Sequence, residues 1–249
     1  MSKVWLITGS SRGFGRELVK AALENGERVV ATARRLEQLD DLVQSYGDRI
    51  RSFALDVTDA AAAHAAVQFA LDEFGTLDVV VNNAGYADSA PIEEMSDGMF
   101  RELIEANLFG VVNVTKAALP VLRKKRSGHI IQFSSIGGRV GGTPGMGAYQ
   151  TAKYAVEGFS EVLNNEVKPL GIKVIIVEPS AFRTDWNGSS MRKLPVGADY
   201  EETVGSMNRF RDSFEGKQSG DPVRGAQIVQ GPRRGSRKMG GAQPVGGLP

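Results

Sequence analysis

The chain has 249 residues, of which 41% are hydrophobic and 24% charged, and its net charge is +1. This composition is typical of a globular protein, and the near-neutral charge gives no case for nucleic acid or a membrane as a partner. The absence of cysteine excludes disulfides, thiolate catalysis and cysteine-ligated metal, and His64 and His129 are too far apart for a metal-ligand motif. No apolar run is long enough to span a membrane and no signal-peptide layout precedes residue 10, so we expect a cytosolic protein without a metal.

The first motif is a glycine-rich turn between an apolar strand and a helix. Residues 3–8 form a short apolar run, Gly9, Gly13 and Gly15 follow, and a helical pattern continues to residue 23. Glycines allow the backbone to approach a pyrophosphate closely, and the helix N-terminus supplies hydrogen-bond donors. The spacing Gly-x-x-x-Gly-x-Gly therefore predicts a dinucleotide-binding loop.

The end of the second predicted strand, residues 28–33, indicates which dinucleotide binds. An acidic residue there would hold the 2′-hydroxyl of an adenosine ribose, but this strand ends in Ala33 and is followed by Arg34. Arg12 lies within the glycine loop, and guanidinium groups pair well with a 2′-phosphate. We therefore expect NADP(H) rather than NAD(H). The alternative is that Arg34 and Arg35 are solvated residues at a helix start.

Further strands are predicted at residues 50–56, 77–82, 128–135 and 173–178, with helical segments between them. Their apolar runs are continuous rather than alternating, as expected for strands covered on both faces. The pattern predicts an α/β fold with a doubly wound parallel sheet, in which ligands bind beyond the carboxyl ends of the strands.

Several polar residues fall at those carboxyl ends. Asp56 could accept a hydrogen bond from an adenine amino group, or could simply cap the next turn. Asn83-Ala84-Gly85 would let a flat ring pass close to the backbone, and asparagine side chains there could tie neighbouring strand ends together. Asn107 lies in the middle of one long predicted helix, residues 96–125, where it could produce a local bend.

Tyr149 and Lys153 lie at the start of a helical run that continues to residue 168. Residues four apart share a helix face, so the phenol and the ammonium point the same way. A nearby ammonium favours the phenolate and lowers the pKa of a tyrosine, which could then exchange a proton with an alcohol or a carbonyl. Without the other motifs, the pair would simply be a half-buried tyrosine beside a solvated lysine.

Residues 180–214 carry scattered large apolar side chains. They could line a substrate pocket or form its lid, or they could pack a pair of short helices on the rim of the sheet. These residues are Phe182, Trp186, Met191, Leu194, Met207, Phe210 and Phe214.

Taken together, these motifs resemble the short-chain dehydrogenase/reductase family over residues 3–215. The motifs that carry the resemblance are Thr8-Gly9-x-x-x-Gly13-x-Gly15, Asn82-Asn83-Ala84-Gly85, Asn107, Ser134-Ser135 and Tyr149-x-x-x-Lys153. The resemblance implies a Rossmann-type sheet with strand order 3-2-1-4-5-6, whose usual seventh strand is not apparent here, and a homo-oligomer. It also implies four catalytic residues, Asn107, Ser135, Tyr149 and Lys153.

In the family pattern, Tyr149 would be the general acid/base, Lys153 would lower its pKa and hold the nicotinamide ribose, and Ser135 would bind the substrate oxygen. Asn107 would place a water in a proton relay behind Lys153, and Thr184 would bind the nicotinamide carboxamide. The pattern and the resemblance together assign these residues to the cofactor: Gly9, Ser11, Arg12, Gly13, Phe14, Gly15, Arg34, Asp56, Val57, Asn83, Ala84, Gly85, Tyr149, Lys153, Pro179, Phe182 and Thr184.

The sequence departs from the family pattern in three places. Ser180 replaces the glycine that usually follows Pro179, which could alter the cofactor loop. The interval from Ser135 to Tyr149 is one residue longer than usual, apparently at residues 141–142, which puts the Ser–Tyr geometry in question. Residues 216–249 are rich in Gly and Pro and basic, so that we expect a disordered tail rather than the family's last helix.

The sequence therefore predicts one catalytic domain, residues 1–215, with a substrate lid at about 180–215. Its expected function is NADP(H)-dependent hydride transfer between nicotinamide and a carbonyl or secondary alcohol, with a small, apolar molecule as substrate. The alternative is a protein on the same fold that binds NADPH without turnover and acts as a regulator or scaffold.

Overall fold

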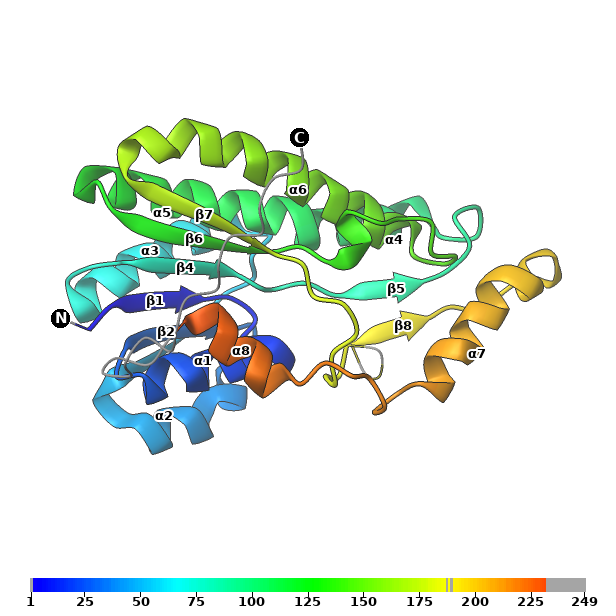
Figure 1. Cartoon of the computed structure of the whole chain (residues 1–249), viewed down its shortest axis with the longest axis horizontal. Helices are drawn as coiled ribbons and strands as arrows, with labels where there is room; N and C mark the ends of the chain where they lie inside the picture. Colours follow the sequence, from blue (N-terminus) through cyan, green and yellow to red (C-terminus); the bar gives the residue numbers. More distant parts are fainter. Residues whose placement is uncertain (1, 187, 189, 232–249) are drawn as a thin grey trace, which may run out of the picture.

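The computed structural model describes residues 2–186, 188 and 190–231, and shows a parallel sheet between two layers of helices (Figure 1). The strand order is β3-β2-β1-β4-β6-β7, and all neighbouring strands are parallel. The predicted order is confirmed, because β5 lies in a separate small sheet. The six strands are β1 Val4–Ile7, β2 Arg28–Ala33, β3 Ile50–Ala54, β4 Val79–Asn82, β6 Gly128–Phe133 and β7 Ile172–Val177.

The continuous apolar runs of the strands bury both faces of the sheet. Successive side chains of a strand point to opposite faces. In β1, Val4 and Leu6 therefore join one hydrophobic core, whereas Trp5 and Ile7 join the other. Leu6 is held in register with Val30 of β2 and Val80 of β4, which places β1 at the centre of the sheet.

Three helices cover each face. The Val4/Leu6 core lies under α3 Ala60–Phe74, α5 Gly110–Lys125 and α6 Gly147–Val167. The Trp5/Ile7 core lies under α1 Gly13–Glu24, α2 Asp40–Tyr46 and α8 Pro222–Gln230. The crossovers thus place every strand's carboxyl end at the same edge of the sheet, where the site is built.

The single helix predicted at residues 96–125 is in fact interrupted. It consists of α4 Asp97–Ile104, one wide π turn at Glu105–Phe109 and then α5. Asn107 is fully buried within that turn. Asparagine is a poor helix residue that competes for backbone hydrogen bonds, and its side-chain nitrogen donates to the carbonyl of Leu103, one turn earlier.

The prediction that residues 216–249 form a tail without the last helix is wrong for α8. Asp221 caps this helix by accepting hydrogen bonds from Val223 and Arg224 N–H, and Ala226 is fully buried against α1. The high glycine and proline content of residues 216–249 misled the prediction. In α8 itself, a Cβ at Gly225 would lie 2.6 Å from the ring of Phe14, so glycine is what lets the helix approach. Residues 232–249 lie outside the described residues.

A smaller lobe projects from the carboxyl edge of the sheet (Figure 1). It contains the two-stranded parallel sheet of β5 Ala87–Ser89 and β8 Met191–Lys193, together with α7 Ser206–Ser213. The sequence analysis did not predict these two strands, which are only three residues each. Within the described chain, no helix combines the length and the apolar character needed to cross a bilayer.

Candidate active site

The glycine loop after β1 has the backbone shape that the sequence predicts. Gly9 and Gly13 have φ values of +68° and +55°, a region that side chains other than glycine rarely adopt. Gly15 is needed for a different reason: a Cβ there would lie 2.3 Å from the carbonyl oxygen of Gly9 and 2.4 Å from the side-chain nitrogen of Asn83. The helix therefore begins directly against the loop, with its N-terminal amides at the carboxyl edge of the sheet.

Asparagine side chains tie the neighbouring strand ends together, as predicted. Asn83 Nδ2 donates to the carbonyl oxygens of Thr8 and Gly9, at 3.0 and 3.2 Å, and thus joins the end of β4 to the glycine loop. Asn82 Nδ2 donates to Gln132 of β6 at 2.8 Å. Thr8 Oγ1 in turn accepts from the backbone N–H groups of Asn83 and Ala84, each at 3.0 Å. This network fixes the floor of the site.

A cleft of about 410 Å³ runs from the glycine loop along the carboxyl ends of β2, β3 and β4. It brings together most residues predicted to bind the cofactor: Gly9, Ser11, Arg12, Gly13, Arg34, Asp56, Val57, Asn83, Ala84, Gly85 and Thr184.

Asp56 occupies the capping role that the sequence analysis kept as its alternative. Its Oδ1 accepts from both the N–H and the hydroxyl of Thr58, at 3.0 and 2.8 Å. The bond from the Thr58 backbone, and to a smaller extent the nearby Arg34, hold the pKa of this carboxyl below its ordinary value. A carboxylate bonded in this way is fixed at the cleft wall.

A second cavity, of about 290 Å³, adjoins the cleft, and both are lined by Asn83, Gly85, Thr184 and Trp186. The four predicted catalytic residues line this second cavity, as do Phe14, Pro179, Ser180 and Phe182. Phe14 packs edge-to-face between Phe133 and Phe182, with ring centroids 5.1 and 5.0 Å apart, and forms one aromatic wall.

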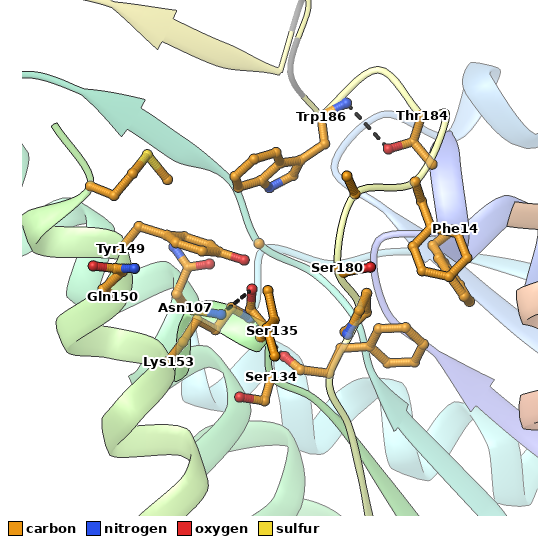
Figure 2. Close-up of a pocket in the computed structure, with 18 of the residues that line it drawn as sticks. Phe14, Asn107, Ser134, Ser135, Tyr149, Gln150, Lys153, Ser180, Thr184 and Trp186 are labelled. Carbon is orange, nitrogen blue, oxygen red and sulfur yellow. Dashed lines mark hydrogen bonds between the residues drawn. The ribbon is translucent and has the colours of Figure 1, made fainter. Parts of the chain in front are cut away.

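Tyr149 and Ser135 meet in this cavity, with Lys153 and Asn107 beside them (Figure 2). The Tyr149 and Ser135 side chains line the same cavity, and Ser135 acts on the pKa of Tyr149, so the additional loop residue does not separate the two side chains. Gln150 takes up the extra length: its Oε1 accepts from the N–H groups of Gly142 and Thr143, at 3.1 and 3.3 Å. These bonds pin the loop to the first turn of α6.

Lys153 is fully enclosed by α6 and β6. Its ammonium donates to the carbonyl oxygen of Phe133 at 2.7 Å and lies 5.6 Å from the centroid of the Tyr149 ring. Asn107 donates from Nδ2 to the carbonyl oxygen of Tyr86 at 2.9 Å, while its buried Oδ1 has no partner among the described residues. A Cβ at Gly85 would lie 2.5 Å from that Oδ1, so glycine keeps the amide accessible.

The prediction that Lys153 lowers the pKa of Tyr149 is wrong for the protein chain alone. Burial raises the pKa of Tyr149 to about 12, and the hydrogen bond with Ser135 offsets only part of that effect. Burial also lowers the pKa of Lys153 to about 8, against a smaller opposing effect of Glu157. Desolvation penalises the charged form of each group, and here it outweighs their helical proximity.

The apolar residues of the segment 180–214 divide between the two roles that the sequence left open. Trp186 lines both cavities, with its ring 5.2 Å from that of Tyr149. Met191 and Leu194 instead pack in the core beneath the small lobe. Phe210 and Phe214 stack on each other and are 60% and 41% exposed, so they line neither cavity.

Arg211 and Gln218 are among the polar residues of the second cavity that the sequence analysis missed. Arg211 was overlooked among the charged residues of the predicted lid, and Gln218 lay in the segment taken for a tail. No spacing or motif marks either one, because loops and a short helix bring them to the cavity only in the folded chain.

The residues that line the cleft suit a dinucleotide. The glycine loop leaves the amides at the start of α1 uncovered by side chains, and the cleft extends from there past Arg12 and Arg34 to Thr184. Gly85 and Trp186 line both the cleft and the second cavity, which contains Tyr149. No cluster of three acidic or histidine side chains suited to a metal occurs in the described part of the chain.

Comparison with known proteins identifies the family. A family profile described as short chain dehydrogenase matches residues 3–194. The chain belongs to this family. The oxidoreductase BOA17 of Botryotinia fuckeliana is 50% identical over 92% of this chain and 84% of its own length. The 3-ketodihydrosphingosine reductase of Bacteroides thetaiotaomicron is 35% identical over 96% of this chain and 81% of its own length.

Solved short-chain dehydrogenase structures agree with the fold. A short-chain dehydrogenase from Streptomyces avermitilis superposes with a TM-score of 0.85 at 40% identity, covering 92% of this chain and 82% of its own. A Brucella melitensis 3-ketoacyl-(acyl-carrier-protein) reductase complexed with NADH (TM-score 0.77, 26% identity) covers 91% of this chain and 88% of its own. ElxO with NADP bound (TM-score 0.75, 28% identity) covers 92% of this chain and 90% of its own. Structural neighbours thus bind either cofactor.

Proposed function

We propose that this short-chain dehydrogenase is an NADP(H)-dependent carbonyl reductase or alcohol dehydrogenase in which Tyr149 is the general acid/base. The observation that carries this proposal is the meeting of Ser135 and Tyr149, backed by Lys153, in a cavity that adjoins the cleft at the glycine loop (Figure 2). A carbonyl compound in the second cavity can contact both hydroxyls at once. The similarity to a 3-ketodihydrosphingosine reductase and to a 3-ketoacyl-(acyl-carrier-protein) reductase supports this reaction class.

The preference for NADP(H) rests on charge at the end of β2. Arg12 and Arg34 line the cleft there and are exposed, and β2 ends in Ala33 rather than in an acidic residue. Asp56, the nearest carboxylate on β3, is engaged by Thr58. Two guanidinium groups suit a 2′-phosphate, whereas no carboxylate at the end of β2 is placed to receive a ribose 2′-hydroxyl.

The nicotinamide, when bound, supplies the two electrons and one hydrogen that reduce a carbonyl carbon. Tyr149, kept protonated at neutral pH by its raised pKa, gives its proton to the carbonyl oxygen, and the Ser135 hydroxyl stabilises the negative charge developing there. The Lys153 ammonium then stabilises the phenolate. Asn107 Oδ1, which is buried and has no donor among the described residues, would order a proton-carrying water behind Lys153.

The variant Tyr149→Phe tests the mechanism, with Tyr154→Phe as its matched control. Tyr154 lies on the same helix, but it is 46% exposed and donates to the carbonyl oxygen of Arg139, outside the cavity. Loss of a general acid typically costs about 10²- to 10⁴-fold. We therefore expect Tyr149→Phe to lose at least about 100-fold in kcat for NADPH oxidation with ketones, while the control retains wild-type turnover.

Cofactor binding is measured separately by quenching of Trp186 fluorescence, because this ring lines both cavities. NADPH should bind more tightly than NADH, and Arg34→Ala should weaken NADPH binding alone. Arg51→Ala is the control, because Arg51 donates to Glu73 and does not line the cleft. Equal weakening of both cofactors would contradict the 2′-phosphate role. Full activity of Tyr149→Phe would contradict the mechanism, and NADPH binding without turnover of any ketone would favour a regulatory or scaffold protein.

A further inference from the structure

The second cavity carries two cationic side chains and no carboxylate. Its charged lining residues are Lys153 and Arg211, and no Asp or Glu contributes to its wall within the described chain. Lys153 is already held by the carbonyl of Phe133 and lies beside Tyr149. Arg211 is therefore the cation left to face whatever molecule occupies the outer part of the cavity.

Arg211 is only 8% exposed and is held firmly by neutral partners. Its Nη1 donates to Ser89 Oγ and to Asn208 Oδ1, at 3.1 and 2.9 Å, and its Nη2 donates to the carbonyl oxygen of Pro144 at 3.0 Å. None of these groups carries a charge. Buried cations are normally paired with anions, so this arrangement fixes the guanidinium without neutralising it.

The nearest carboxylate does not neutralise Arg211. Asp212 is the adjacent residue, but its Oδ1 accepts from the ammonium of Lys193 and its side chain is 58% exposed. Burial is the main influence on Arg211 and lowers the pKa of its guanidinium, with Asp212 acting weakly in the opposite direction. The cofactor phosphates would lie in the other cleft, near Arg12 and Arg34, and cannot supply the missing charge either.

Gln218 provides a second, independent indication. It is 2% exposed and lines the same cavity, yet neither Nε2 nor Oε1 has a hydrogen-bond partner among the described residues. Gln150, which also lines this cavity, contrasts with it, because both of its amide atoms are bonded to the loop at residues 142–143. An unpaired buried amide costs about 1–3 kcal/mol, so a polar ligand group is the natural partner of Gln218.

We propose that the substrate is an oxo acid, or the corresponding hydroxy acid, whose carboxylate is bound by Arg211 and Gln218 while its carbonyl lies against Ser135 and Tyr149. Arg211 would contribute charge and Gln218 an amide donor, and Trp186, Met146 and Phe182 would contact the apolar carbons between the two ends. This assignment rests on the proposed function and gives it a substrate class.

The reaction leaves the carboxylate unchanged. The carbonyl carbon gains a hydrogen with two electrons from NADPH, the carbonyl oxygen gains the proton of Tyr149, and the products are a hydroxy acid and NADP⁺. The anionic group therefore serves recognition only. An interaction that stabilises the bound substrate and the transition state equally affects mainly KM, so loss of carboxylate recognition should raise KM and leave kcat nearly unchanged.

Pairs of oxo acids and their methyl esters test the proposal. Acetoacetate, levulinate and 5-oxohexanoate place the carboxylate at increasing distance from the ketone, and each methyl ester keeps the carbon skeleton but lacks the charge. Hydrogen bonds to charged groups contribute about 1.5–3 kcal/mol, so we expect at least one acid to exceed its ester by at least about tenfold in kcat/KM, mainly through KM.

Variants then locate the recognition. Gln218→Leu removes two buried atoms that bond to nothing in the described chain, so its thermal stability should be unchanged or higher and its NADPH binding unchanged. The KM for the preferred acid should rise about tenfold, whereas the KM for its ester should not. Arg211→Lys should keep part of the preference for the acid over its methyl ester, and Arg211→Gln should abolish that preference. A purely structural role of Arg211 would instead lower the melting temperature and affect acid and ester equally.

The outcomes separate this proposal from the proposed function. Esters reduced as efficiently as every acid would overturn the carboxylate site and leave the reductase intact. If neither acids nor esters oxidise NADPH, the proposed function fails, and calorimetric titration of the NADP⁺-loaded protein with the same acids and esters decides the carboxylate site. The carboxylate site is supported if an acid binds and the Gln218→Leu variant binds that acid more weakly. It is overturned if acids and esters bind equally well.

Discussion

Tyr149 and Lys153 show how far a side chain's chemistry depends on burial. On an exposed helix, an ammonium one turn from a phenol would lower the phenol's pKa, which is what the sequence predicts. In the folded chain both groups are enclosed, and their pKa values move in the directions that favour the neutral forms. The site therefore holds a neutral acid beside a readily neutralised cation.

This arrangement makes a prediction about stability and pH. The pKa of Lys153 is about 8 in the folded chain, against an ordinary value of 10.5, so between these values the unfolded chain binds more protons and stability rises with pH. Between pH 8 and about pH 9.5, the free energy of unfolding of the wild type should rise by roughly 2 kcal/mol relative to that of Lys153→Met. Urea unfolding at each pH measures this difference.

Tyr149 sets the upper limit of that measurement. Its pKa is raised from 10.0 to about 12, so its contribution to stability is present below pH 10 and is lost as the pH rises further. Parallel stability curves for the wild type and Lys153→Met below that limit would mean that Lys153 titrates at its ordinary pKa.

At the scale of elements, the pairing of β5 with β8 attaches the small lobe to the site. Ala87 of β5 and Met191 of β8 pair in register and share a core with Tyr149. Asp88 of β5, whose side chain is fully buried, accepts two hydrogen bonds from Arg192 of β8, at 2.9 and 2.6 Å. Because each strand has only three residues, this ion pair is a large part of what joins them.

Removal of the cation from this pair should therefore destabilise the protein. Breaking a buried pair typically costs about 3–5 kcal/mol, but Arg192 is 59% exposed, so we expect Arg192→Met to lower the free energy of unfolding by about 2 kcal/mol. The double variant Asp88→Asn/Arg192→Met should recover part of that loss, since it leaves no unpaired buried carboxylate. Additive effects in urea unfolding would show that the two side chains are not coupled.

At the scale of the whole molecule, α8 completes the layer of helices that covers the Trp5/Ile7 core (Figure 1). Ala226 is fully buried there, and Gly225 lies against the rings of Phe14 and Phe182. A helix distant in sequence thus supports both the core and the aromatic wall of the site.

A chain that ends at Gly220 tests this support, and a chain that ends at Gly231 is its matched control. Exposure of the apolar surface under α8 should cost roughly 2–3 kcal/mol, and the freed Phe14 should weaken NADPH binding. Both effects are measured against the chain ending at Gly231, by urea unfolding and by Trp186 fluorescence. Identical behaviour of the two chains would show that α8 contributes nothing to the core or the site.

The patterns of the sequence determined the strands of the main sheet, the glycine loop and the pair of Tyr149 and Lys153, whereas the strand order and the inclusion of Asn107 and Ser135 came from the family resemblance. Apolar runs, glycine spacing and helical periodicity are local patterns, and the parallel topology brings the strand ends together. Only the tertiary structure decided the pKa directions of Tyr149 and Lys153, the docking of α8 and the convergence of Arg211 and Gln218 on the second cavity. The physical reason is that desolvation and close helix packing depend on neighbours remote in sequence, which no local pattern records.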